Sequence, residues 1–331
     1  MPLLLVLDGN SLIHRAYHAG SAEGQLSDDG RPIWALRGLV GYLARAAASL
    51  NPDAVIVGFD CPLSSARRID YPAYKAHRPE KPADLTEQIG GAPALLRAAG
   101  VCVVVPSAYE ADDVLASAAF SARRSAWQSV LMTSDRDAFA LIDDNTSVLR
   151  VRNGGFDEAV LIDADGLHAV CGVQPGQYRD FAALRGDPSD NLHGVRRFGA
   201  TTAAKLLHNF GSVDAAFAAE AAAVREAVGE LAAGHFLSPE SREIVDRNRR
   251  LMSMRADLDL PPLSDARLPL DYLTMRRALL GRGINLGPSL WALVGGAAPA
   301  VEETIPEQRP WVFRSGLTAR RDPTPGQMAL F

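Results

Sequence analysis

The chain has little cysteine: three residues among 331, namely Cys61, Cys102 and Cys171, which lie far apart. No two of them form the Cys-x-x-Cys pair typical of structural zinc sites, and small disulfide-stapled domains contain many more. Cys102 lies within a run of valines, where a buried core thiol is the simplest interpretation. This composition favours a reduced, cytoplasmic protein without a zinc centre.

The sequence also lacks long apolar runs. None approaches the roughly 20 residues needed to cross a bilayer, so no membrane partner is expected. No basic region precedes the short apolar run at the N-terminus, and Asp8 interrupts that run. Residues 3–7 therefore predict a β-strand and not a signal peptide.

Basic residues are not in excess, since 34 Lys and Arg stand against 39 Asp and Glu, for a net charge of -5. Taken alone, this argues mildly against a nucleic-acid partner. Affinity for nucleic acid depends on local basic surfaces, however, and the chain has two basic stretches, at residues 67–81 and 185–205. The total charge therefore does not exclude a nucleic-acid partner.

What the chain does contain is a repeated association of apolar runs with carboxylates. Four apolar runs each lead to acids, which are Asp8, then Asp60, then Glu110, Asp112 and Asp113, and finally Asp135 and Asp137. Parallel strands present their carboxyl ends at one edge of a sheet, where ligands bind. Seven acids at one edge would repel each other, so we expect divalent cations held by oxygen ligands.

The alternation of strand and helix patterns predicts an α/β fold with a mostly parallel sheet. Strands are expected at residues 3–7, 54–59, 101–105 and 129–133, and helices at 33–49, 84–99, 110–123 and 135–142. Further short strands are expected within residues 146–162. The predicted organisation is a first domain at 1–163, a helical region at 164–296 and a polar, proline-rich tail at 297–331.

Each acid taken alone has an ordinary explanation. A terminal Asp on a strand commonly starts a turn, and acids in a first helical turn complement the helix dipole. These explanations must all hold together, however, and the three acids within residues 110–113 exceed what one helix dipole needs. The joint interpretation is a metal site.

The helical half contributes two more acids, Asp187 and Asp190. They precede a glycine turn at residues 194–199 (Gly-Val-Arg-Arg-Phe-Gly) that opens a helix containing Thr201 and Lys205. Exposed amides at such a turn, with a nearby Lys, form a phosphate-binding arrangement. A plain helix–turn–helix with a threonine cap is the alternative interpretation.

The order of these motifs resembles that of the bacterial 5′ nuclease family, over about residues 3–290. The matching motifs are Leu-Asp-Gly-Asn (7–10), Phe-Asp (59–60), Tyr-Lys-x-x-Arg (74–78), Glu-Ala-Asp-Asp (110–113), Thr-Ser-Asp-Arg-Asp (133–137) and Gly-Asp-x-x-Asp-Asn (186–191). That family includes the N-terminal 5′→3′ exonuclease domain of bacterial DNA polymerase I and the stand-alone flap endonucleases.

The resemblance implies a PIN-like nuclease domain followed by a helix–three-turn–helix DNA-binding element at about residues 174–210. It also implies two divalent cations, Mg²⁺ or Mn²⁺. The family's metal-site acids correspond to Asp8, Asp60, Glu110, Asp112 and Asp113 at the first metal, and to Asp135, Asp137, Asp187 and Asp190 at the second. All nine positions are acidic here, which argues against an inactive homologue.

The first basic stretch corresponds to the family's arch over the active site, at about residues 61–83. Lys75 and Arg78 match the cations beside the scissile phosphate, where fixed positive charge stabilises the transition state. Tyr74 is expected to stack on an unpaired base, worth on the order of 1–3 kcal/mol, and Arg67 is expected to contact DNA. A solvated basic loop is the alternative.

The hairpin departs from the family pattern Gly-x-x-Gly-x-Gly, because Arg197 replaces the middle glycine. A positive φ at that position would cost an arginine about 1 kcal/mol or more. Arg197 therefore affects two expectations: the exact geometry of the hairpin and the binding of a K⁺ ion to it. DNA contacts are expected from Gly194, Arg196, Arg197, Gly199, Thr201 and Lys205.

The resemblance implies a structure-selective 5′ nuclease, acting as a 5′→3′ exonuclease and a 5′-flap endonuclease in replication and repair. DNA with 5′ flaps, nicks or ends is the expected partner, and the protein is expected to be a monomer. A PIN-type ribonuclease is one alternative, although it would not need the long helical half or the arch. A non-catalytic branched-DNA-binding module is the other, although it should have lost acids.

The last six residues, Gly-Gln-Met-Ala-Leu-Phe at 326–331, resemble the sliding-clamp-binding pentapeptide, with Met328 where Leu is more usual. Gln327, Leu330 and Phe331 are the expected clamp contacts, because an extended tail with apolar anchors suits docking into a pocket. An ordinary tail is the alternative. No polymerase domain follows in this sequence, so the expectation is a nuclease that acts alone or is recruited.

Overall fold

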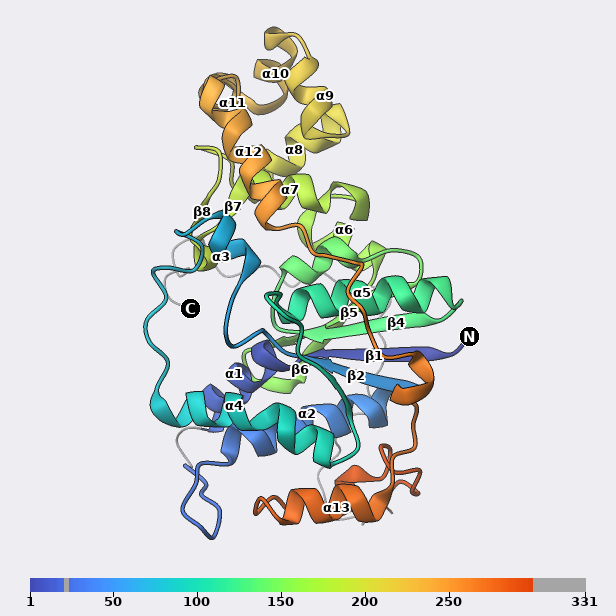
Figure 1. Ribbon diagram of the computed structural model, residues 1–331. Helices are drawn as coiled ribbons and strands as arrows, with labels where there is room; N and C mark the ends of the chain where they lie inside the picture. The colour runs from blue at the N-terminus through green and yellow to red at the C-terminus, as the bar shows by residue number, and fades with distance from the viewer. Residues whose placement is uncertain (21–23, 300–331) are drawn as a thin grey trace. The chain divides into compact units, whose positions relative to one another are not determined.

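The computed structural model of the chain describes residues 1–20 and 24–299. Its central sheet has six strands in the order β3-β2-β1-β4-β5-β6 (Figure 1). The strands are β1 (Leu3–Asp8), β2 (Ala54–Gly58), β3 (Cys102–Val104), β4 (Gln128–Thr133), β5 (Thr146–Arg152) and β6 (Gly155–Ile162). Neighbouring strands are parallel except β5 and β6, which form an antiparallel hairpin. The predicted α/β class with a mostly parallel sheet is confirmed.

Alternate residues of the strands face two separate cores. Leu5 and Leu7 of β1 belong to one core, whereas Leu4 and Val6 belong to the other. This follows from the geometry of a strand, in which successive side chains point to opposite faces. Both faces are buried, as expected for parallel strands covered by helices on both sides.

Helices α1 (Gly9–Gly20), α2 (Trp34–Leu50) and α4 (Ala83–Ala98) cover the first face. The short helices α13 (Tyr272–Leu280) and η5 (Gly287–Leu290) join the same core, through Met275, Leu279 and Leu290. Residues 272–293, which the sequence grouped with the helical region, therefore pack on the first domain. Their apolar side chains find their partners in α2 and α4, far away in sequence.

Helix α5 (Ala111–Arg124) and the 3₁₀ helix η1 (Asp137–Leu141) cover the second face. The expected helix at 135–142 is thus shorter and tighter than predicted. Asp135 accepts a hydrogen bond from the backbone N–H of Asp137, which competes with a regular first helical turn.

The helical region continues the core of the second face (Figure 1). Its helices are α6 (Ala164–Cys171), η2 (Pro175–Gln177), α7 (Tyr178–Arg185), α8 (Ala200–Phe210), α9 (Val213–Ala218), α10 (Ala221–Val228), α11 (Glu230–Phe236) and α12 (Pro239–Leu251). Between α7 and α8 lie β7 (Gly186–Asp187), the 3₁₀ turn η3 (Pro188–Asp190) and β8 (Leu192–His193). This α7-to-α8 unit occupies the range predicted for the helix–three-turn–helix element.

The arch region contains α3 (Ala66–Asp70) followed by turns. The predicted clamp contacts Gln327, Leu330 and Phe331 lie outside the described residues. Within the described part of the chain, no helix has both the length and the apolar character needed to cross a bilayer.

Candidate active site

The acids predicted at the strand ends meet at one edge of the sheet. Asp8 is the last residue of β1, which pairs with β2 on one side and β4 on the other. Asp60 follows β2 and Asp135 follows β4, so their carboxylates lie on either side of Asp8. Asp112, in the first turn of α5, is repelled by both Asp8 and Asp135 and therefore belongs to the same cluster.

Asp8 is held by two hydrogen bonds at the base of the cluster. Its Oδ1 accepts from the backbone N–H of Ser11 at 2.9 Å, and its Oδ2 accepts from the Thr133 hydroxyl at 2.8 Å. Burial, together with a smaller repulsion from Asp60, raises the pKa of Asp8 to about 7. A cation bound beside Asp8 would favour its ionised form.

The Oδ1 atom of Asp112 is buried without a hydrogen-bond partner in the described structure. Burial first, and then repulsion by Asp8, raises the pKa of Asp112 well above its usual value. A buried polar atom without a partner is costly, and a bound ion is one of the few groups that can satisfy it. The oxygen donors and the charge of this cluster therefore fit a hard divalent cation.

A second group of acids lies where the helical region meets the sheet. One carboxylate oxygen from each of Asp137, Asp187 and Asp190 lies within 4.8 Å of the others. Burial, followed by repulsion from Asp135, raises the pKa of Asp137 well above its usual value. Three acids predicted at the second metal therefore lie together. The fourth, Asp135, is close enough to repel both Asp137 of this group and Asp112 of the first.

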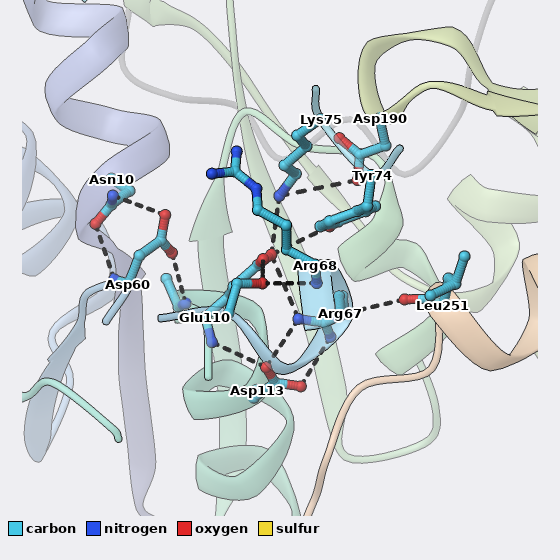
Figure 2. Close-up of polar contacts among 12 residues, drawn as sticks. Asn10, Asp60, Arg67, Arg68, Tyr74, Lys75, Glu110, Asp113, Asp190 and Leu251 are labelled. Atoms are coloured by element: carbon cyan, nitrogen blue, oxygen red, sulfur yellow. Dashed lines mark hydrogen bonds and ion pairs between the residues drawn. The ribbon is translucent and has the colours of Figure 1, made fainter. Parts of the chain in front are cut away.

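Glu110 is enclosed by donors from the arch. Its Oε2 accepts from Lys75 Nζ at 2.8 Å and from the Tyr74 hydroxyl at 3.1 Å, while Oε1 accepts from Ser65 at 3.0 Å (Figure 2). Burial alone would raise the pKa of Glu110, but Lys75 and Arg67 outweigh it, so the pKa lies below its usual value. Lys75 and Glu110 thus form a charged pair beside the acid cluster.

Hydrogen bonds and an ion pair join the arch to the β7–β8 segment. The Lys75 backbone N–H donates to the Asp190 carbonyl at 3.0 Å, and Asn191 donates to the Ala73 carbonyl at 2.9 Å. Arg78 binds the Asp190 carboxylate at 2.7 Å. Tyr74 is 4% exposed and packs with Leu192. The predicted stacking of Tyr74 on a base therefore requires the arch to separate from the β7–β8 segment.

Asp113 is not free to bind an ion in this conformation. It is 1% exposed, and its two oxygens accept from Arg67 at 2.8 and 2.9 Å and from the backbone N–H groups of Glu110 and Arg255. Removing one partner of such a buried pair costs about 3–5 kcal/mol. The structure therefore places Asp113 and Arg67 in a buried ion pair. Their roles as a metal ligand and a DNA contact stay predictions.

The glycine hairpin keeps its turn despite Arg197. Arg197 has a φ of 71°, the left-handed conformation that a glycine would adopt at no cost. Gly194 is packed so closely that a Cβ would lie 2.2 Å from the Arg185 backbone. Exposed side chains surround the turn and the start of α8, namely Arg196, Arg197, Thr201 and Lys205.

The structure adds residues that the sequence analysis missed. A cavity of about 410 Å³ is lined by Asp135, Asp137 and Asp187 together with Arg15, Arg136 and Arg185. Asn10 donates to Asp60 at 2.8 Å and accepts from its backbone N–H. The Leu-Asp-Gly-Asn motif contained the signal for Asn10. Arg136 lies in the Thr-Ser-Asp-Arg-Asp motif and Arg185 begins the second basic stretch, whereas no motif contained Arg15.

Acid clusters that hold divalent ions can serve phosphodiester hydrolysis, and positive side chains beside them can neutralise phosphate charge. The fold and site therefore define a metal-dependent nuclease. Within that class, the chain belongs to the 5′-3′ exonuclease family. The family's N-terminal resolvase-like domain matches residues 3–169, and its C-terminal SAM fold matches residues 173–271.

Relatives of known sequence agree with this assignment. DNA polymerase I of Mycobacterium leprae is 35% identical over 264 residues, which cover 80% of this chain and 28% of the relative. The thermostable DNA polymerase I of Thermus aquaticus is 37% identical over 212 residues, covering 64% and 24% respectively. The chain thus spans about a quarter of the length of these relatives.

Solved structures share the fold. The T5 D15 protein co-crystallised with metal ions superposes with a TM-score of 0.61 at 21% identity, covering 76% of this chain and 89% of that one. The catalytic core of Rad2 in complex with a DNA substrate superposes with a TM-score of 0.54 at 14% identity, covering 89% and 92%.

Without divalent ions, we expect the thermal stability of the protein to fall as the pH rises from about 4 to about 7. The folded-state pKa of Asp8 is about 7, against 3.8 for an ordinary Asp, and those of Asp112 and Asp137 are raised as well. An acid with a raised folded-state pKa contributes stability below its unfolded value and loses it as the pH passes the folded value. Scanning calorimetry across this range should show the decline.

Added MgCl₂ should raise the melting temperature most at the alkaline end, where the ion meets carboxylates that carry no protons. Asp112→Asn should weaken both the decline and the rescue. A melting temperature that rises with pH over this window, or one that Mg²⁺ leaves unchanged, would contradict the metal site.

Proposed function

We propose that this protein is a structure-selective 5′ nuclease that hydrolyses DNA phosphodiester bonds at 5′ ends and 5′ flaps, in replication and repair. The observation that carries the proposal is the convergence of acids from the sheet edge and from the helical region beside Lys75 and Arg78. Membership of the 5′-3′ exonuclease family supports it.

Two divalent cations, Mg²⁺ or Mn²⁺, would be held by the acid cluster, with Asp8, Asp60, Glu110, Asp112 and Asp113 at the first site and Asp135, Asp137, Asp187 and Asp190 around the second. Two of the first set, Glu110 and Asp113, bind Lys75 and Arg67 in the structure. When bound, such ions activate a water at neutral pH and stabilise the leaving oxygen. The proposal includes a K⁺ ion at the hairpin, because Arg197 retains the positive φ of the glycine it replaces.

The side chains of this protein would position the strand and stabilise charge. Lys75 Nζ lies 2.8 Å from Glu110 Oε2, and Arg78 lies 2.7 Å from Asp190, so both cations are held next to the acids. Negative charge that builds on the phosphoryl oxygens would draw them toward the substrate. The exposed basic residues of the hairpin would contact duplex phosphates without reading sequence.

The proposal is tested by assaying the purified chain on flap, nicked and single-stranded DNA, with magnesium or manganese, beside matched substrates whose 5′ strand is RNA. We expect cleavage of the DNA flap near its junction with the duplex. Faster cleavage of RNA alone would support a PIN-type ribonuclease instead, and binding without cleavage of any substrate would support a non-catalytic DNA-binding module.

We also propose that residues 326–331 bind a sliding clamp. The protein that binds the clamp and acts on DNA is proposed to be a monomer. The support is the match of Gln327, Leu330 and Phe331 to the clamp-binding pentapeptide. Deleting residues 327–331 should abolish retention on an immobilised clamp, and unchanged retention would remove the proposal.

A further inference from the structure

Two neighbouring arginines of α3 have opposite environments. All the N–H groups of the Arg67 guanidinium face acceptors: Asp113, Glu110, and the carbonyls of Leu251 and Ser253. Its side chain is 12% exposed. Arg67 therefore cannot release its donors to a substrate without breaking contacts that tie α3 to α5 and to the end of α12.

Arg68 is exposed, and no hydrogen bond or ion pair engages its guanidinium in the described structure. Its backbone N–H donates to Ser65, the residue that caps α3, so the start of its side chain is fixed. Figure 2 shows the side chain extending from α3 toward the space between Asn10 and Lys75, with its head group away from Arg67. The Ser65 hydroxyl that accepts from the Arg68 N–H donates to Glu110 at 3.0 Å, so the Arg68 side chain starts beside the acid cluster.

We propose that Arg68 binds a phosphate of the unpaired 5′ strand, beside the scissile phosphate, and so positions that strand over the acids. The proposal rests on the proposed function, because it assumes that a nucleic-acid strand enters this edge of the sheet. A guanidinium can bind a phosphate with two parallel hydrogen bonds, and Arg68 has its donors available. The acid cluster would repel the phosphates of an approaching strand. A cation beside the cluster, such as Arg68, would reduce that repulsion.

The first test measures how DNA binding depends on salt. The probe is a duplex with a 5′ oligo-dT flap, bound by the full chain in EDTA so that no cleavage occurs, and titrated at several KCl concentrations. Each phosphate contact on a single strand contributes about 0.7 to the slope of log K against log salt. Arg68→Ala should weaken binding about 10-fold at low salt and reduce that slope by about 0.7, whereas Arg68→Lys should keep the slope.

The matched control is Arg37→Ala. Arg37 is an exposed arginine of α2 without a side-chain partner in the described structure, on the opposite face of the sheet from α5, and its removal should leave the slope unchanged. An unchanged slope for Arg68→Ala, or an equal loss for Arg37→Ala, would overturn the proposal. Equal melting temperatures of the variants would exclude loss of folding as the cause.

The second test locates the contact. Methylphosphonates, which lack the phosphate charge, replace the flap phosphates one at a time. One position next to the scissile bond should weaken binding of the wild type but not of Arg68→Ala, whereas additive effects at every position would refute the contact. Both readouts are of binding, so a wild type that binds but does not cleave with Mg²⁺ would refute the proposed function and leave the Arg68 contact standing.

Discussion

Replacing Asp112 with Asn should lower the single-turnover rate of flap cleavage by roughly 10³-fold with Mg²⁺ present, while DNA binding stays close to that of the wild type. The substitution keeps the shape of the side chain but removes the charge from a buried oxygen that has no hydrogen-bond partner among residues 1–20 and 24–299. That oxygen has no structural contact to lose, so the loss should be confined to chemistry. Loss of one negative charge facing a polyanion should not weaken DNA binding.

Asp135→Asn should behave in the same way, because Asp135 interacts with Asp8, Asp112 and Asp137 and so belongs to both acid sets. Asp144→Asn is the matched control, since Asp144 is exposed and lies outside the cluster. The rate is measured by rapid quench with enzyme in excess, and the dissociation constant by anisotropy in EDTA. Wild-type-like cleavage by either cluster variant would refute the metal site.

Lys75→Ala should slow the chemical step by about 10²-fold and change the dissociation constant by less than about 3-fold. Its ammonium group is 2.8 Å from Glu110 and 3.8 Å from Asp190, beside the acid cluster. A cation in that place acts where charge develops on the transferred phosphoryl group. Under the proposed function, duplex binding depends on the hairpin residues instead.

Lys205→Ala should have the opposite effect to Lys75→Ala. Lys205 is exposed on α8 near the glycine hairpin, so its loss should weaken binding and leave the single-turnover rate at saturation unchanged. The same two measurements on both lysine variants therefore separate chemistry from binding. Weakened binding with an unchanged single-turnover rate for Lys75→Ala would refute its proposed role.

The strands and the acidic edge could be predicted because both follow from local rules. Apolar runs such as residues 3–7 suit a strand buried on both faces, and a parallel sheet brings the ends of its strands to one edge. The position of Asp8, Asp60 and Asp135 directly after such runs was therefore sufficient to place them together. Two elements there differ from the prediction. Helix α1 (Gly9–Gly20) was not expected, and η1 is shorter than expected where Asp135 accepts a hydrogen bond from the backbone N–H of Asp137.

The roles of the arch residues could not be predicted in the same way. Arg67 and Arg68 are the same residue type, side by side, in one stretch of charge. What separates them is that Arg67 meets Asp113, Leu251 and Ser253, which lie 46, 184 and 186 residues away. Tyr74 is likewise buried by Leu192, which the helical region brings to it.

The order of apolar runs and carboxylates in this chain was enough to establish an α/β sheet with acids at one edge, since strand periodicity and parallel pairing act over a few residues. Only the tertiary structure decided which acids remain open to an ion and which cations remain open to a substrate. Within the described residues, Asp112 Oδ1 and the Arg68 guanidinium have no hydrogen-bond partner, whereas Asp113 and Arg67 bind each other. The physical reason is that hydrogen bonding in and around a buried site depends on groups that folding brings from distant parts of the chain.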